Sequence, residues 1–164
     1  MRGVGKRMGW AVVVVLALAL VAYAGPKASA QKTTAKVSVA KLGFSMPLPP
    51  GWVVDSKDPT KFYMQGKAKT HYGKVESFPL GSKTLDSFIT TKLSDSKIDV
   101  KNRRTVGDYR GYEVISSKPG EGVILELDIQ KGKQVIRVYF HVPGEDFPKL
   151  ENGFRKSFSS IKLK

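Results

Sequence analysis

Hydrophobic positions follow two different spacings along this chain, and the changes between them divide it into elements. In residues 37–46, apolar residues stand among polar and small ones in a roughly strand-like pattern that ends at the proline-rich segment 47–50. Residues 51–54, Gly-Trp-Val-Val, open a second extended segment. We therefore predict one strand, a proline-rich turn and a second strand that buries Trp52.

Two further strands and a helix follow. Residues 62–66 and 73–78 have the composition of short strands, which the basic loop 67–72 joins as a hairpin. From residue 85 the spacing becomes helical, with Thr84 placed as the N-cap and Asp86 in the first turn. The apolar positions of this helix are Leu85, Phe88, Ile89 and Leu93. They form one stripe, which we expect to lie against a sheet.

The next section predicts a meander of antiparallel strands. Its four segments are residues 99–106, 109–117, 123–130 and 134–142. Glycine-containing turns at 119–122 and 131–133 separate the later segments. In the third segment the neighbours Ile124 and Leu125 are both apolar, and neighbouring residues of a strand point to opposite faces of the sheet. This strand is therefore predicted to be buried on both faces, near the centre of the sheet.

Helical spacing returns in the last section. Its apolar positions are Phe147, Leu150, Phe154, Phe158 and Ile161. Glu145 and Asp146 fall at the positive end of this helix, and Arg155 and Lys156 lie nearer its negative end. Strands, a helix, a meander and a closing helix together predict an α+β fold, in which an antiparallel β-sheet is flanked by helices as an α/β/α sandwich.

The first thirty residues have the layout of a secretory signal peptide. A positively charged start is followed by an apolar stretch at residues 10–24 and by a small-x-small cleavage pattern, Ala28-Ser29-Ala30. Cleavage after Ala24 is the alternative to cleavage after Ala30. The apolar stretch is shorter than the ~20 residues of a spanning helix, although an uncleaved segment that tethers the domain to the membrane is the competing interpretation.

These features predict the domain organisation and the location of the protein. We assign a signal peptide to residues 1–30, a flexible leader to 31–36 and one domain to 37–164. The protein is expected to be exported, to the periplasm or the extracellular space. The chain has no cysteine, which excludes disulfides, thiol nucleophiles, thiolate metal sites and lipid anchoring through a cysteine.

The charge of the chain indicates an acidic partner. The sequence has 28 Lys and Arg against 14 Asp and Glu, and removal of the four basic residues of the signal region leaves 24 minus 14, or +10. Such a charge attracts polyanions over a long range. Export and the spread of the lysines along the chain argue against nucleic acid, so an acidic protein or an acidic envelope polymer is the predicted partner.

Two groups of basic residues are candidates for the docking surface. One precedes and begins the meander and consists of Lys101, Arg103, Arg104 and Arg110. Alternate residues of a strand share a face, so Lys101 and Arg103 are expected to point together. The other group lies in and beside the loop 67–72 and consists of Lys67, Lys69, His71 and Lys74. Ordinary solvated charge is the alternative interpretation of both groups.

Catalytic and metal-binding signals are weak. His71, predicted as an exposed loop residue, and His141, predicted as a partly exposed residue at a strand end, are the two histidines, and no Gly-x-Ser-x-Gly elbow is present. A hydrolase that uses one of these histidines stays an alternative. The acidic pairs with some ligand potential are Asp55 and Asp58, Glu121 and Glu126, and Glu145 and Asp146. None has the spacing of a known calcium or zinc motif, and no cofactor is predicted.

Three segments resemble the PsbP-like family. They are Phe-Ser-Met-Pro at 44–47 with Pro-Gly-Trp at 50–52, the segment 107–113 that opens the meander, and Asn-Gly-Phe-Arg-Lys-Ser-Phe at 152–158. The family includes an extrinsic subunit of photosystem II and small bacterial envelope proteins of the DcrB type. The resemblance implies an α/β/α sandwich and a non-enzymatic binding or accessory role, without implying a role in photosynthesis, since one fold carries several unrelated tasks.

Overall fold

The computed structural model describes residues 34–164, so the predicted signal peptide lies outside the described residues. The strands and helices in chain order are β1 (Lys36–Val39), the 3-10 helix η1 (Ala40–Leu42), β2 (Phe44–Pro47), β3 (Trp52–Val54), β4 (Lys61–Met64), β5 (Tyr72–Pro79), α1 (Leu85–Lys92), β6 (Lys97–Val106), β7 (Tyr109–Lys118), β8 (Gly122–Lys131), β9 (Gln134–Val142), α2 (Phe147–Ser159) and β10 (Lys162–Leu163). Among these residues no helix is long and apolar enough to cross a membrane.

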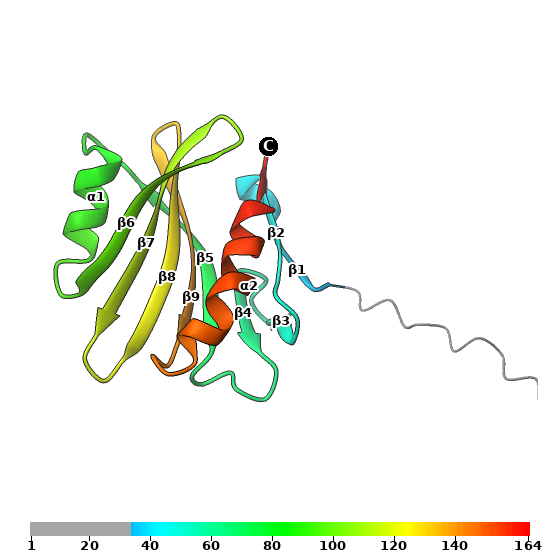
Figure 1. Cartoon of the computed structure of the whole chain (residues 1–164). Coiled ribbons are helices and arrows are strands. Elements are labelled where there is room, and N and C mark those ends of the chain that lie inside the picture. Colours follow the sequence, from blue (N-terminus) through cyan, green and yellow to red (C-terminus); the bar gives the residue numbers. More distant parts are fainter. Residues whose placement is uncertain (1–33) are drawn as a thin grey trace, which may run out of the picture. The chain divides into compact units, whose positions relative to one another are not determined.

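A large antiparallel sheet forms the centre of the domain. Its seven strands are ordered β3-β4-β5-β9-β8-β7-β6, and a second sheet of three short strands has the order β1-β2-β10 (Figure 1). The meander predicted from residue 99 onward is confirmed as β6 to β9, and the predicted hairpin is confirmed as β4 and β5. The middle of β8 is buried on both faces, as the apolar neighbours Ile124 and Leu125 predict.

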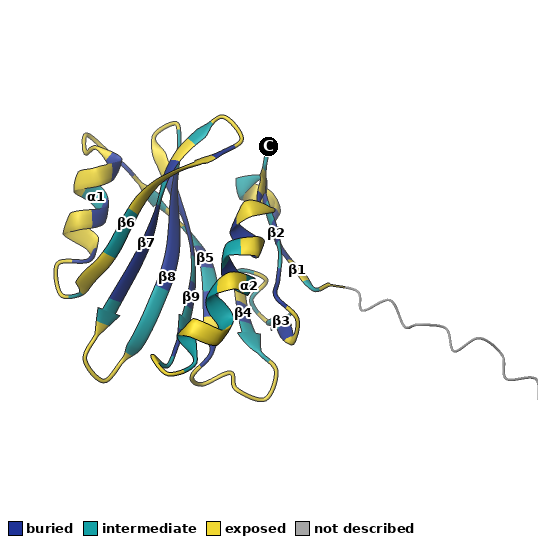
Figure 2. Ribbon diagram, in the orientation of Figure 1, coloured by how far each residue is buried: buried dark blue, intermediate teal, exposed yellow. Residues whose placement is uncertain are grey.

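The two helices cover opposite faces of the large sheet. Val114 and Ile115 are neighbours on β7 and therefore point to opposite faces. Val114 belongs to the smaller apolar cluster with the stripe of α1, whereas Ile115 belongs to the main core with Phe154 and Phe158 of α2. The buried residues accordingly follow the middle strands, between exposed outer surfaces of the helices (Figure 2). The predicted α+β fold with a sheet flanked by helices is confirmed.

Aromatic rings fill the core between the sheet and α2. Phe140 of β9 stacks on Phe154 of α2 with 4.2 Å between the ring centroids, and Trp52 meets Phe140 edge-on at 5.1 Å. Phe62 and Phe158 complete the cluster. Gly73 of β5 makes room for it, because a Cβ at this position would lie 2.2 Å from the Phe62 ring. Buried aromatic pairs of this kind contribute beyond their area.

The helix α1 begins where its sequence predicts. The Thr84 side chain accepts a hydrogen bond from the backbone N–H of Ser87 at 3.1 Å, and Asp86 lies in the first turn. Its buried stripe packs on Val114 and Val135. Because the helix has eight residues, it covers one part of its sheet face and leaves the rest without a helix.

The prediction of one strand over residues 37–46 is wrong. The segment forms the antiparallel hairpin β1–β2, which turns through η1 and Gly43. Gly43 has φ +64°, and a Cβ there would lie 2.7 Å from the backbone oxygen of Lys164. The closing helix is also shorter than its apolar spacing predicts, since it ends at Ser159 and residues 162–163 pair with β2 as β10.

Candidate functional site

The basic group around the loop between β4 and β5 is largely paired with acids. Lys67 Nζ lies 3.6 Å from Asp146 Oδ2, and Lys74 Nζ lies 2.8 Å from Glu76 Oε1. Lys69 is exposed and forms no ion pair with the described acids. Of this predicted group, Lys69 therefore carries the charge most available to a partner.

The second predicted group is divided between two faces of the sheet. Lys101 and Arg103 share the face of α1, as their alternation predicts, because they lie opposite Val114 and Tyr112 of β7. Arg104 points to the other face, where its Nη2 lies 2.9 Å from Glu113 Oε2. Lys101 is paired as well, with Asp86 of α1 at 2.7 Å.

Arg103 and Arg110 remain without an acidic partner and lie near one end of the large sheet. Arg110 is opposite Thr105, two residues from Arg103 on β6, which makes the two arginines diagonal neighbours on one face. The turn between β8 and β9 lies at the same end, because Gly111 of β7 is opposite Ile129 of β8. The register of the strands thus brings the basic residues of the β8–β9 turn close to Arg103 and Arg110, although they are distant in the sequence.

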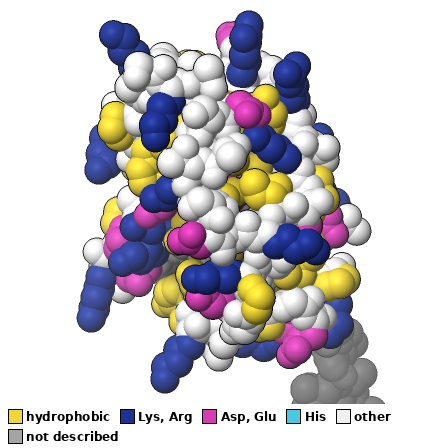
Figure 3. All heavy atoms as spheres, turned by 90° about the vertical axis from the view of Figure 1, so that its left-hand side faces the viewer, with side chains coloured by type: hydrophobic (Ala, Val, Ile, Leu, Met, Phe, Trp, Pro, Cys, Tyr) yellow, Lys and Arg dark blue, Asp and Glu magenta, His cyan; other side chains and the backbone are white. Residues whose placement is uncertain are grey.

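We call this surface the basic end and define it by Lys83, Arg103, Arg110 and Lys133. Lys133 belongs to the β8–β9 turn, and Lys83 follows Leu80, whose N–H donates to the Lys133 carbonyl at 2.8 Å. No ion pair joins any of the four to an acid of residues 34–164, whereas the neighbouring Lys131 donates from Nζ to the backbone carbonyls of Leu42 and Lys164. Figure 3 shows Lys and Arg side chains standing out around its upper end, which is this end of the sheet.

The prediction that His71 is exposed is wrong. Its side chain is 2% exposed and bridges two polar groups. The carboxylate of Asp146, at the start of α2, lies 3.1 Å from His71 Nε2, and Thr70 Oγ1 lies 2.9 Å from Nδ1. Partial burial acts to raise the pKa of the Asp146 carboxyl, but the nearby positive charges, chiefly that of Lys67, and the hydrogen bonds that the carboxyl accepts together outweigh it, so the pKa is lowered. An ionised carboxylate only accepts, so Nε2–H donates to Asp146. In the neutral imidazole Nδ1 then accepts from the Thr70 hydroxyl, which also lies 3.4 Å from the Lys67 carbonyl oxygen.

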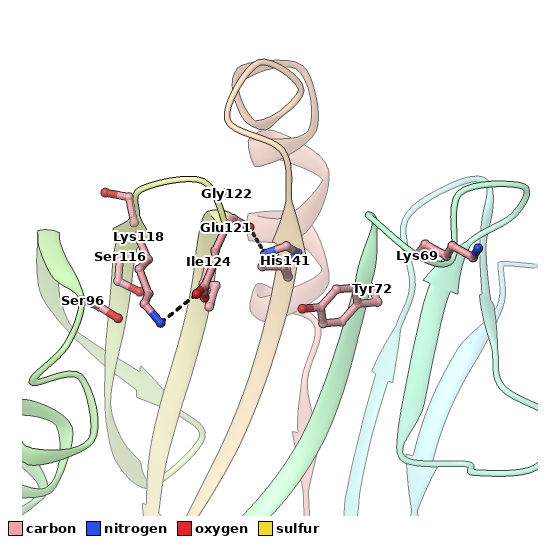
Figure 4. Close-up of a pocket in the computed structure, with 10 residues that line it drawn as sticks. Lys69, Tyr72, Ser96, Ser116, Lys118, Glu121, Gly122, Ile124 and His141 are labelled. Carbon is pink, nitrogen blue, oxygen red and sulfur yellow. Dashed lines mark hydrogen bonds and ion pairs between the residues drawn. The ribbon is translucent and has the colours of Figure 1, made fainter.

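His141 lies in a pocket at the opposite end of the sheet from the basic end. The pocket has a volume of about 330 Å³ and is open between the β7–β8 hairpin and the start of β5 (Figure 4). His141 Nε2 is hydrogen-bonded to the backbone carbonyl of Glu121, and its ring stacks on Tyr72 with 4.5 Å between the ring centroids. The prediction that His141 is partly exposed at a strand end is confirmed.

A buried charged cluster beneath α1 was not predicted. Arg137 of β9 forms two hydrogen bonds with Asp128 of β8, at 2.8 and 3.1 Å, whereas its Nη2 is 3.3 Å from Glu126 Oε1. Burial, followed by the nearby charge of Asp128, raises the pKa of Glu126 to about 8. Arg137 is therefore matched mainly by Asp128, and Glu126 is mostly protonated at neutral pH. The sequence signal that could have indicated this cluster is the presence of Glu126, Asp128 and Arg137 within two otherwise largely apolar strands.

The described residues contain no group of three or more side chains suited to hold a metal ion. The predicted acidic pairs do not assemble with further ligands there. Glu121 instead pairs with Lys118 at 2.7 Å, and Asp146 binds His71.

Comparisons with known proteins identify the fold. No protein-family model matches the chain, and a search of curated proteins finds no match. Among solved structures, the cyanobacterial PsbP protein CyanoP from Synechocystis sp. PCC 6803 is similar with a TM-score of 0.54 and 16% identity, over 79% of this chain and 91% of that one.

Two other solved structures give similar values. LpqN from Mycobacterium tuberculosis, described as involved in cell envelope biogenesis, has a TM-score of 0.54 and 11% identity, over 74% of this chain and 83% of that one. PA94 from Pseudomonas aeruginosa, a protein of unknown function described as a putative regulator, has a TM-score of 0.53 and 8% identity, over 63% and 81%. The order of strands and helices and these similarities together show that this chain has a PsbP-like fold.

Proposed function

We propose that this chain is an exported, non-enzymatic binding protein of the cell envelope, which docks an acidic protein or an acidic envelope polymer through its basic end. The observation that carries the proposal is the concentration of basic side chains without acidic partners on one end of the sheet. Five of the eight basic residues predicted from sequence are paired with acids of the domain itself.

The basic end has the properties of an electrostatic docking surface. Its residues come from segments far apart in the sequence and lie around the β6–β7 and β8–β9 turns. Asp108 is the acidic residue of these two turns. Exposed charges of one sign raise the rate of encounter with an oppositely charged partner and are screened by salt. We therefore expect binding that weakens steeply with ionic strength, without turnover of the partner.

A charge-reversal experiment tests this surface. Immobilised poly-L-glutamate serves as the acidic polypeptide and polygalacturonate as the acidic polysaccharide. The double variant Arg103→Glu/Arg110→Glu is compared with Lys57→Glu/Lys69→Glu, which changes the net charge by the same amount at other exposed sites. We expect the first variant to lose at least ~10-fold in affinity at low salt, about 1.4 kcal/mol, and the second to lose much less. Equal losses would show that net charge alone acts and would contradict a localised site.

Export is tested by the intact mass of the protein recovered outside the cytoplasm. A mass that begins at Gln31 or at Gly25 supports the signal peptide. A mass that retains residues 1–24 contradicts cleavage and favours the tethered alternative.

A hydrolase remains the second candidate, because of the chain of hydrogen bonds from Thr70 through His71 to Asp146. A hydroxyl, an imidazole and a carboxylate in series are the elements of nucleophilic catalysis. In this protein they also fasten the β4–β5 loop to the start of α2. Hydrolysis of p-nitrophenyl acetate by the wild type and by Thr70→Ala distinguishes the roles. A rate above buffer that Thr70→Ala abolishes supports catalysis, and a wild-type rate equal to buffer excludes esterase activity at this site.

A further inference from the structure

The pocket beside His141 is built on a part of the sheet that α1 leaves uncovered. One row of residues runs straight across four strands, because Ser116 of β7 is opposite Ile124 of β8, which is opposite His141 of β9, which is opposite Tyr72 of β5. All four line the pocket. Figure 4 shows side chains of this row along its floor, with the β7–β8 hairpin on one side and Lys69 on the other.

Polar atoms without a protein partner concentrate at this floor. The described residues have four buried side-chain nitrogen or oxygen atoms that make no hydrogen bond, and two of them are Ser116 Oγ and His141 Nδ1. Ser116 is 1% exposed and lines the pocket. Leaving such a group unpaired in a buried place is unfavourable, so this arrangement calls for a bound molecule that pairs with it.

The hydrogen bond of His141 determines what its free nitrogen requires. A backbone carbonyl only accepts, so Nε2 carries the proton that is donated to Glu121. In a neutral imidazole, Nδ1 is then an acceptor and needs a donor. Ser116 Oγ can both donate and accept. A ligand that fits this floor therefore donates a hydrogen bond to His141 Nδ1 and either donates to or accepts from Ser116 Oγ. Hydroxyl groups can do both.

The walls match a neutral ligand with an apolar face. Lys118 and Glu121 form an ion pair at 2.7 Å across the hairpin, so their charges compensate each other. The unpaired Lys69 lies at the rim, and its amine points away from the floor (Figure 4). Tyr72 is 37% exposed and, with Ile124, adds aromatic and aliphatic surface to the polar floor. A volume of about 330 Å³ is at the lower limit of the range of small-molecule sites, ~300–1,000 Å³.

We propose that this pocket binds a neutral saccharide unit, whose hydroxyl groups pair with Ser116 Oγ and His141 Nδ1 while its C–H face packs on Tyr72. A sugar combines closely spaced hydroxyl groups, each both donor and acceptor, with an apolar ring face, and this is the combination that the floor and wall present. The site lies at the opposite end of the sheet from the basic end and does not depend on the acidic partner.

Titration followed by NMR tests the proposal. The probes are cellobiose, maltose and N,N′-diacetylchitobiose, with sodium acetate as the anionic control and glycerol as the minimal polyol. We expect at least one disaccharide to shift the Tyr72, Ile124 and His141 resonances saturably, and acetate and glycerol to leave them unchanged. Saturation by acetate in place of the sugars would overturn the proposal in favour of an anion site.

Two substitutions locate the binding. Ser116→Ala removes one hydroxyl and is expected to weaken the saccharide at least ~5-fold, and Tyr72→Ala at least ~10-fold. Tyr109→Ala, at the other end of the sheet, is the matched control, and Arg103→Glu/Arg110→Glu is expected to bind the sugar normally. The last result separates this site from the basic end. The absence of saturable shifts with all three disaccharides at millimolar concentration, or equal binding by Ser116→Ala and wild type, overturns the proposal.

Discussion

Glu126 imposes a pH-dependent cost on the folded protein, and replacing it with glutamine measures that cost. Its side chain is 3% exposed. Asp128, the next residue on the same face of β8, lies closer to Arg137, at 2.8 Å against 3.3 Å for Glu126. Burial raises the pKa of Glu126 from 4.5 to about 8. Because the folded pKa is the higher one, the folded protein binds the proton more tightly than the unfolded chain does. Stability is therefore fullest below pH 4.5 and is lost as the pH rises toward 8.

The magnitude follows from the separation of the two pKa values. Each pH unit between them costs about 1.4 kcal/mol, so the loss from pH 4.5 to pH 7 is at most about 3 kcal/mol. Glu126→Gln keeps the size of the side chain and removes the titration. The difference in unfolding free energy, variant minus wild type, should therefore rise by up to about 3 kcal/mol over that range. Titrations shared by the two proteins cancel in this difference.

Urea unfolding followed by tryptophan fluorescence supplies the free energies, because Trp52 is buried among phenylalanine rings. Measurements at pH 4.5, 5.5, 6.5 and 7.5 define the slope. Glu145→Gln is the control, since Glu145 is exposed and its variant should give a flat difference. A flat difference for Glu126→Gln would show that folding does not raise the pKa of Glu126, and a difference that falls with pH would show that Arg137 stabilises the ionised carboxylate. Either result refutes the reasoning.

Three further substitutions test the packing. Phe154→Ala removes the ring that stacks on Phe140 and is expected to cost about 3–5 kcal/mol in urea unfolding, whereas loss of less than 1 kcal/mol would contradict its place in the core. Gly73→Ala places a Cβ 2.2 Å from the Phe62 ring and from the Tyr139 carbonyl, so its thermal midpoint should fall by several degrees, and an unchanged midpoint would show that β4 and β5 are farther apart. His71→Ala should increase amide hydrogen exchange in the loop 67–72 more than in α1, because the loop loses its bond to Asp146.

Local signals explain what the sequence could predict. The cap at Thr84 and the stripe that follows it act within a few residues, so the start of α1 is predicted correctly. The strands of the meander alternate or are apolar throughout, and glycine turns separate them, which makes their existence and order predictable. Similarly, the motifs at residues 44–52 and 152–158 indicate the fold that the comparisons show.

Contacts between distant segments explain what it could not predict. His71 is buried by Asp146, 75 residues later, and no feature of the loop announces this partner. The split of residues 37–46 into two strands depends on Gly43, which packs on the backbone of Lys164. The basic end likewise joins Arg103 and Arg110 to a lysine of another turn through strand register alone. The row of pocket residues is visible only after four strands are aligned.

The small sheet has a consequence for the order in which the protein is made. Its middle strand, β2, pairs with β1 on one side and with β10 on the other. The sheet that residues 36–47 begin is therefore complete only when residues 162–163 have paired with β2. During synthesis the ribosome still holds the later residues while the early ones are already outside, and loop closure over such a separation is slow. A nascent chain therefore keeps β2 exposed along one edge until residues 162–163 have left the ribosome. If the chain is exported unfolded, in line with the proposed export, this delay prolongs the period in which it can still pass through a membrane channel.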